Sequence, residues 1–350
     1  MSWLQKRILN WFQSLVLRII KTGEMPKHVA FIMDGNRRYA NKHNLSQREG
    51  HSKGFDKMKE VLNWCMYLGI IEVTVYMFSI ENFKRSKKEV DNLMDIIRQI
   101  FKHLLENKKK LKDDGVCCRV IGNLSLLSED MCKLITEVMI LTRENNRIFI
   151  NYAIAYTSRD EITHAIKDII QGVKDSDILP EDINEDLITD CLYTYKSSNP
   201  DLLIRTSGET RLSDFLMSQV SNTCIYFTKV LWPEFSLWNF LSTIFYYQRC
   251  YSSLQKNKNN LKPIMHNSVQ AFSRSHEWRA TSSSSCRPRD DGSKRSTAIA
   301  VVRRELVGCE GVVFQGGTGA DGSCGEGVRE RRSEHENEQQ RVQGNRRRSD

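Results

Sequence analysis

One stretch of the sequence indicates how this chain folds: His28-Val29-Ala30-Phe31-Ile32-Met33-Asp34-Gly35-Asn36-Arg37-Arg38. An apolar, β-branched run stops there at an acid, a glycine and two arginines, which predicts a buried strand that ends at a site for anions. A glycine lets the backbone approach a ligand closely, the next helical turn offers free N–H groups, and guanidiniums bind phosphate oxygens in pairs. The predicted ligand therefore carries phosphate groups.

Asp34 has a different role in this prediction, because a carboxylate does not itself attract phosphate. Among so much positive charge it can hold a hard cation such as Mg²⁺, which would bridge it to the oxygens of a diphosphate. The alternative is an ordinary helix start, with Asp34 as its cap and the arginines exposed to solvent. Two further stretches favour the ligand site.

Those two stretches have the same form, an apolar strand followed by arginines. They run from Val73 to Arg85 and from Asp201 to Ser213. In a parallel sheet the carboxyl ends of the strands open on one edge, so the three tips can converge on one ligand. The tips supply more positive charge than one diphosphate requires, so we expect a site for two diphosphates, built from Arg37, Arg38, Arg85, Arg205 and Arg211.

Four ordered motifs carry a resemblance to a known family. They are D-G-N-R-R-Y-A from Asp34 to Ala40, G-H at Gly50 and His51, F-S-x-E-N-F-x-R from Phe78 to Arg85, and I-R-T-S-G-E-x-R-x-S from Ile204 to Ser213. The chain resembles the cis-prenyltransferases, the undecaprenyl diphosphate synthase family, over residues 1–260. Arg37 stands where the bacterial members have glycine, so the resemblance is closer to the eukaryotic catalytic subunits that make dehydrodolichyl diphosphate.

The resemblance implies an activity. Members of that family condense isopentenyl diphosphate onto an allylic diphosphate such as farnesyl diphosphate, form the new double bonds in cis and require Mg²⁺. The implied product is a long-chain dehydrodolichyl (polyprenyl) diphosphate for dolichol and protein glycosylation. The implied location is the endoplasmic reticulum membrane, with peripheral attachment and the catalytic domain facing the cytosol.

The resemblance also implies roles for individual residues. Asp34 would hold Mg²⁺, and it would lie with His51 and Asn82 near the reacting carbons. Gly35, Arg37 and Arg38 would bind the allylic diphosphate, and Asp34 and Asn36 would also belong to the substrate-binding residues. The isopentenyl diphosphate would be bound by Arg85, Arg205, Arg211 and Ser213.

Three departures from the family pattern bear on partners. A family arginine would fall at Gln47, with Arg48 beside it, a bacterial carboxylate would fall at Cys224, and a tryptophan of the helix expected after Ser213 would fall at Ser218. An incomplete site implies a heteromer with a Nogo-B receptor-like subunit of the same fold, which would contact the segment around Ser218.

Two other functions are alternatives to this one. The first is a non-catalytic scaffold subunit of the same fold, but a scaffold has no use for the converging arginines. The second is a trans-type synthase, which would need D-D-x-x-D motifs, and the pairs Asp113-Asp114 and Asp290-Asp291 lack the third aspartate.

Composition narrows the class of partner without deciding it. A net charge of +9 and a pI near 9.0 favour anionic partners. We expect no nucleic acid, because no RNA- or DNA-binding signature accompanies the charge. Ten cysteines without C-x-x-C spacing indicate reduced thiols and not a zinc site.

The chain divides into three parts. Residues 1–22 are expected to form an amphipathic helix that carries Leu4, Ile8, Trp11, Phe12, Leu15 and Ile19 on one face and basic side chains on the other. This face suits either the interface of an anionic membrane or packing on the domain itself, over the mouth of a tunnel. Residues 23–262 form the catalytic domain, and residues 263–350 are a low-complexity tail that is not expected to fold alone.

The predicted fold class is α/β. Strands are expected at 28–33, 71–78, 116–121, 148–155, 201–204 and 224–228, in a central six-stranded, mainly parallel sheet that is flanked by helices. Apolar stripes at helical spacing predict helices over 51–68 and 89–107. These stripes suit core packing, and by resemblance the same two helices would line a tunnel for the growing chain.

Overall fold

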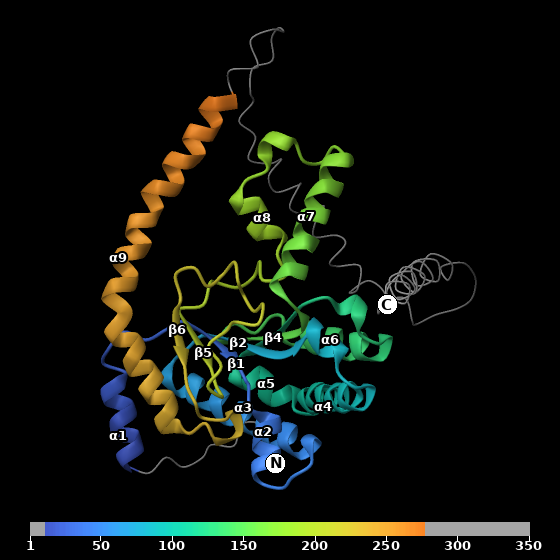
Figure 1. The fold of residues 1–350 in the computed structure, drawn as a ribbon, viewed down its shortest axis with the longest axis vertical. Coiled ribbons are helices and arrows are strands. Elements are labelled where there is room, and N and C mark those ends of the chain that lie inside the picture. The colour runs from blue at the N-terminus through green and yellow to red at the C-terminus, as the bar shows by residue number, and fades with distance from the viewer. Residues whose placement is uncertain (1–10, 277–350) are drawn as a thin grey trace, which may run out of the picture. The chain divides into compact units, whose positions relative to one another are not determined.

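The computed structural model describes residues 11–276, with the side chains of Gln13 and of residues 15–256. A single six-stranded sheet lies at its centre (Figure 1). Its strands are β1 (His28–Ile32), β2 (Glu72–Ser79), β3 (Val116–Ile121), β4 (Ile148–Tyr156), β5 (Leu202–Arg205) and β6 (Cys224–Phe227). Every pairing is parallel and the order is β3-β4-β2-β1-β5-β6, which confirms the predicted fold class.

Helices connect and cover the strands. The α-helices are α1 (Trp11–Ile20), α2 (Asn36–Lys42), α3 (Gln47–Leu68), α4 (Lys87–Glu106), α5 (Lys108–Asp114), α6 (Glu129–Thr142), α7 (Ser158–Lys174), α8 (Glu185–Cys191) and α9 (Leu237–His276). Four short 3₁₀ helices are η1 (Ile80–Lys84), η2 (Leu124–Leu126), η3 (Pro180–Asp182) and η4 (Trp232–Glu234). The two predicted helices are α3 and α4, and each begins a little earlier than expected because Ser46 and Ser86 cap them.

The strand order explains why the three motif-bearing tips meet. β1 lies between β2 and β5, and its last residue, Ile32, pairs with Tyr76 on one side and Arg205 on the other. Ligands of open parallel sheets bind outside the carboxyl ends of the strands, where the strand order reverses. The three sequence motifs therefore converge at one edge, as predicted.

β1 is buried on both faces. Val29 and Phe31 belong to the main hydrophobic core, which includes apolar residues of α3, α4 and α9. Ala30 belongs to a smaller cluster that contains Phe215 and Leu216, from the segment that follows β5. Burial on both faces explains the unbroken apolar run in the sequence.

One element was predicted wrongly. A helix was expected to begin after Ser213, but residues 213–220 form turns, and Ser213, Asp214 and Leu216 have positive φ angles of 51°, 60° and 51°. The segment is held by tertiary contacts: the Arg159 side chain donates to the Asp214 carboxylate at 2.8 Å, and the Ser158 N–H donates to the Asp214 carbonyl at 2.8 Å. Such contacts override a local helical pattern.

Helix α1 spans Trp11–Ile20 within the segment predicted to be an amphipathic helix, and residues 1–10 lie outside the described part. Leu17 is buried in the main core, whereas Leu15 and Ile19 are 43% and 59% exposed. The helix therefore packs on its own domain through a different side from the predicted apolar face, which leaves Leu15 and Ile19 outward. Among the described helices, none combines the length and apolar character that a membrane crossing needs.

Helix α9 runs past residue 262 to His276. Residues 277–350, most of the predicted tail, lie outside the described part. The boundary at residue 262 and the tail both stay predictions.

A buried polar network crosses the sheet at the edge opposite the motifs. The Asn151 amide donates to the Glu72 carboxylate at 2.8 Å, to the Thr74 hydroxyl at 3.0 Å and to the Ser197 hydroxyl at 2.7 Å. The His28 ring contacts the same threonine at 2.7 Å, and burial lowers its pKa, so the imidazole is neutral at pH 7. The network joins β1, β2 and β4 to the segment that leads into β5.

We expect Asn151→Ala to destabilise the fold by about 2 to 3 kcal/mol, because it removes the buried amide that donates to Glu72, Thr74 and Ser197. The measurement is the free energy of unfolding in urea. Asn41→Ala, at an exposed position of α2, is the matched control and should change that free energy by less than about 0.5 kcal/mol. Equal stability of the two variants would contradict the assignment.

Candidate active site

The tip of β1 is fixed by its neighbours before any ligand binds. The Asp34 N–H donates to the Thr206 hydroxyl at 3.0 Å, and that hydroxyl donates back to the Asp34 carbonyl at 2.7 Å. The backbone N–H of Trp232 donates to the same carbonyl at 3.0 Å. Residues after β5 and in η4 thus hold the backbone that carries the Asp34 carboxylate.

Gly35 is required by both conformation and space. Its φ is +109°, a backbone angle that residues with a side chain rarely adopt. A Cβ there would lie 3.0 Å from the Leu231 side chain and 3.1 Å from Ser207 Cβ. The glycine therefore lets the chain turn into α2 while the segment after β5 packs against it.

Arg205 joins the β1 and β5 tips. It is buried, and its Nη2 donates to Asp34 Oδ2 at 2.9 Å. Its Nη1 donates to Ser213 Oγ at 2.8 Å and to the Arg211 carbonyl. A single guanidinium thus links the predicted metal ligand to two residues that were predicted for the isopentenyl side.

Arg38 also spans the two tips. Its guanidinium donates to the Ser207 carbonyl at 2.9 Å and to the Ser207 hydroxyl, and lies 3.6 Å from Asp34 and 3.4 Å from Glu209. Arg211 pairs with the same glutamate and is the more exposed of these arginines, so it lies at the rim. About half of the Arg38 side chain is exposed, which leaves donors free for a ligand.

The third tip adds Arg85 and brings in a carboxylate that the motifs do not contain. Arg85 Nη1 lies 2.7 Å from Glu89 Oε1, and Arg37 Nη1 lies 3.6 Å from the same oxygen. Asn82 stands in η1, where its amide oxygen accepts from the Ser79 N–H at 2.9 Å. The Asn82 side chain therefore helps to hold the backbone where β2 passes into η1.

The charges of this edge do not cancel. The five predicted arginines pair with three carboxylates, those of Asp34, Glu89 and Glu209. Two positive charges are left over, and the guanidinium donors are only partly used. The edge is therefore an anion site of the kind that binds phosphate oxygens.

Two polar groups at the inner wall of this site have no partner. Asn36 Oδ1 and His51 Nε2 are buried, and neither has a hydrogen-bond partner within the part of the chain that the structure describes. Burial lowers the pKa of His51 to about 4, and the nearby Arg85 contributes to the shift. The imidazole is therefore neutral at pH 7 and can accept or donate one hydrogen bond.

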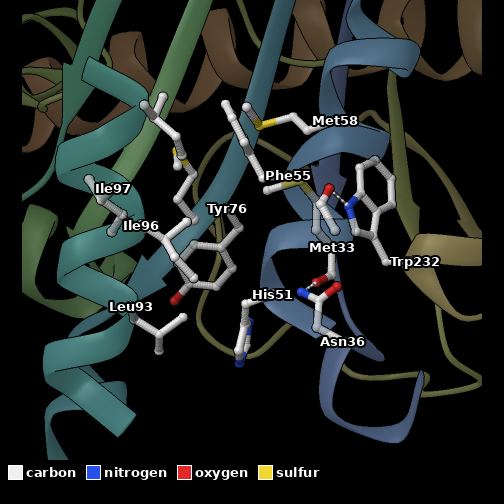
Figure 2. Close-up of a pocket in the computed structure, with 13 residues that line it drawn as sticks. Met33, Asn36, His51, Phe55, Met58, Tyr76, Leu93, Ile96, Ile97 and Trp232 are labelled. Carbon is white, nitrogen blue, oxygen red and sulfur yellow. Dashed lines mark hydrogen bonds between the residues drawn. The ribbon is translucent and has the colours of Figure 1, made fainter. Parts of the chain in front are cut away.

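An apolar pocket continues inward from these two residues (Figure 2). It lies between α3 and α4 against the end of β2, and its lining is Met33, Asn36, His51, Gly54, Phe55, Met58, Tyr76, Met77, Leu93, Ile96, Ile97, Ile100 and Trp232. The Trp232 indole donates to the Gly54 carbonyl at 2.7 Å, so the one polar atom of that ring is satisfied. The predicted apolar lining of α3 and α4 is present.

Residues missed by sequence reasoning complete the site. Thr206, Ser207 and Glu209 lie inside a quoted motif, so the motif could have indicated them. Glu89 lies in the first turn of α4, where an acidic residue is ordinary, and no sequence signal distinguishes it.

The departures from the family pattern lie in different places. Gln47 is the first residue of α3, and Arg48 beside it is exposed. Cys224 was interpreted as a position near the diphosphates, and within one chain this is wrong. It pairs with Leu202 at the start of β5, whereas Arg205 pairs with Phe227, so Cys224 lies roughly 10 Å from the site edge.

A metal ion at this site would need ligands from the bound diphosphate in addition to those from the protein. Among the described residues there is no group of three or more histidine, cysteine, aspartate or glutamate side chains that could hold a metal ion. Asp34 offers one partly exposed carboxylate, of which Oδ2 already accepts from Arg205. This fits Mg²⁺, which is commonly bound by one or two carboxylates together with phosphate oxygens and water.

Comparisons with known proteins agree with this arrangement. The family model described as "Putative undecaprenyl diphosphate synthase" matches residues 32–254. A dehydrodolichyl diphosphate synthase complex subunit from Homo sapiens is 53% identical over 256 residues, 73% of this chain and 77% of that protein. A tritrans,polycis-undecaprenyl-diphosphate synthase (geranylgeranyl-diphosphate specific) from Pyrococcus abyssi is 42% identical over 70% of this chain and 92% of that protein.

Solved structures give the same result. Lavandulyl diphosphate synthase from Lavandula x intermedia, in complex with dimethylallyl diphosphate, is similar with a TM-score of 0.60 and 34% identity, over 64% of this chain and 95% of that chain. The matched residues contain all three strand tips and the pocket between α3 and α4. The chain belongs to the undecaprenyl diphosphate synthase family of cis-prenyltransferases and is a polyprenyl diphosphate synthase.

Proposed function

We propose that this enzyme adds isopentenyl diphosphate units to farnesyl diphosphate and makes long-chain dehydrodolichyl diphosphate for dolichol and protein glycosylation. The observation that carries the proposal is the continuity of a cationic edge with an apolar pocket. An allylic diphosphate has a charged head and an apolar chain. The head fits the arginines of the strand tips, and the chain fits the space between α3 and α4.

The arrangement supports separate binding residues for the two diphosphates. Arg37, Arg38 and the backbone at Gly35 would bind the allylic diphosphate, because they flank Asn36 in the sequence and Asn36 lines the pocket. Arg205, Arg211 and Ser213 would bind the isopentenyl diphosphate. Arg38 is suited to contact both, since its guanidinium lies between Asp34 on one tip and Ser207 on the other. Two substrates held this way are aligned for attack.

The chemistry needs charge stabilisation at the leaving group. As the allylic carbon–oxygen bond breaks, negative charge develops on the departing diphosphate, and fixed guanidiniums stabilise that charge without reorganising. The neutral His51 ring lines the pocket and would face a ligand bound there. It would orient the substrate with Asn36.

Asp34 would hold Mg²⁺ through its partly exposed carboxylate, with diphosphate oxygens as further ligands. The metal, when bound, would neutralise diphosphate charge and favour its departure. Arg205 would then keep the carboxylate in place by its 2.9 Å contact.

Asp34→Ala should lower turnover by about two or more orders of magnitude, equivalent to about 3 kcal/mol of lost charge stabilisation. Asp34→Asn keeps the shape of the side chain but removes its charge, and its turnover should fall nearly as much. The measurement is incorporation of radiolabelled isopentenyl diphosphate, with circular dichroism to confirm folding. Asp56→Ala, at an exposed position of α3, should retain full activity. Full activity of Asp34→Ala would contradict the assignment of Asp34 as the metal ligand.

Arg211→Ala should separate the two substrates. It should raise the KM for isopentenyl diphosphate by roughly tenfold to a hundredfold, because a charged hydrogen bond contributes about 1.5 to 3 kcal/mol. The KM for farnesyl diphosphate should change by less than about threefold. Arg205→Ala should impair both substrates, since Arg205 also holds Asp34. If the farnesyl KM rises instead in Arg211→Ala, the two pockets are exchanged.

The proposal includes a partner and a location. Several relatives are named as complex subunits, which supports a heteromer with a Nogo-B receptor-like subunit of the same fold. Exposed apolar side chains support a contact on α7, where Ile166 and Ile170 lie one turn apart and are about half exposed, and at the neighbouring Met217 and Ser218 segment. We place the complex at the endoplasmic reticulum membrane, attached peripherally and facing the cytosol.

Co-expression with that partner should raise the specific activity of the full chain at least tenfold, because the partner would complete and order the site. Ile170→Glu should abolish co-purification, since it places a charge in an apolar contact. Leu141→Glu, an equally exposed position on α6, should leave co-purification intact. A purified chain that is as active alone as in the mixture would show that no partner is needed.

A further inference from the structure

Glu89 is the one carboxylate of the site that no motif contains, and its position is unusual for a helix-start residue. It lies in the first turn of α4, and only 12% of its side chain is exposed. Its Oε1 atom contacts Arg85 at 2.7 Å and Arg37 at 3.6 Å. These arginines follow different strands, β2 and β1, so one oxygen joins two tips.

The geometry of the contacts distinguishes two roles. A carboxylate that competed with substrate would occupy the guanidinium donors that diphosphate needs. Here each arginine contacts Glu89 through Nη1 alone. A guanidinium has five N–H donors in a planar fork, so the remaining donors of both groups stay available for phosphate oxygens.

We propose that Glu89 is a positioning residue, which uses one acceptor oxygen to hold Arg37 and Arg85 in the orientation that binds diphosphate. This inference rests on the proposed function, since it assigns the two arginines to substrate. Long side chains lose rotamer freedom when they bind a ligand, and a residue that fixes them beforehand removes part of that cost. Glu89 also connects the arginines to α4, the helix whose next three turns line the apolar pocket.

The test is binding of inorganic diphosphate to the full chain by isothermal titration calorimetry, which does not depend on turnover. Glu89→Ala should bind diphosphate roughly three- to tenfold more weakly than the wild type. Glu89→Gln keeps the acceptor oxygen and should bind within about twofold of the wild type. Asp91→Ala removes a carboxylate from an exposed position of the same helix and should bind like the wild type.

A second background tests whether Glu89 acts through Arg85. In Arg85→Ala, the further change Glu89→Ala should weaken diphosphate binding by less than about twofold, because its main contact is already absent. A role limited to the start of α4 would lower the melting temperature of Glu89→Ala and leave its diphosphate affinity unchanged, which would overturn the proposal. Affinity for Glu89→Ala equal to or tighter than the wild type would do the same, as would equal losses in Glu89→Ala and Glu89→Gln. Failure of the wild type to bind diphosphate would instead overturn the proposed site itself.

Discussion

The ion pair between Arg205 and Asp34 is the interaction on which the rest of the site depends. A buried guanidinium is costly unless its donors are used, and both terminal nitrogens of Arg205 donate, Nη2 to Asp34 and Nη1 to Ser213 and a backbone carbonyl. Its Nε has no partner within the described part of the chain. The pair fixes the tip of β1 against the tip of β5 and anchors the turns after Ser213. The site is therefore assembled before substrate arrives, which is what stabilisation of developing charge requires.

The surplus of positive charge and the apolar pocket have complementary roles. The strand tips gather five arginines at one edge because the strands are parallel and β1 lies between β2 and β5. The pocket exists because α3 and α4 turn apolar side chains toward one another beside that edge. A ligand with only a charged head, or only an apolar chain, would use half of this arrangement. A prenyl diphosphate uses both halves.

Much of this could be predicted from the sequence, for identifiable physical reasons. β1 and β5 read as unbroken apolar runs because they are buried on both faces, and α3 and α4 have strong helical periodicity. The turns after Ser213 could not be predicted, because contacts from Arg159 and Ser158, far away in the sequence, hold left-handed residues there. Glu89 resembles any acidic residue at a helix start. The outward side of α1 and the far-edge position of Cys224 depend on packing and strand register, which local pattern does not contain.

The central claim is that one ligand spans the cationic edge and the apolar pocket. The most direct measurement is a crystal structure of the protein with the unreactive analogue farnesyl thiodiphosphate and Mg²⁺. We expect the diphosphate within hydrogen-bond distance of Arg37 and Arg38, the metal on Asp34, and the farnesyl chain between Phe55 on α3 and Ile97 on α4. A farnesyl chain bound outside that pocket, or a diphosphate away from the strand tips, would contradict it.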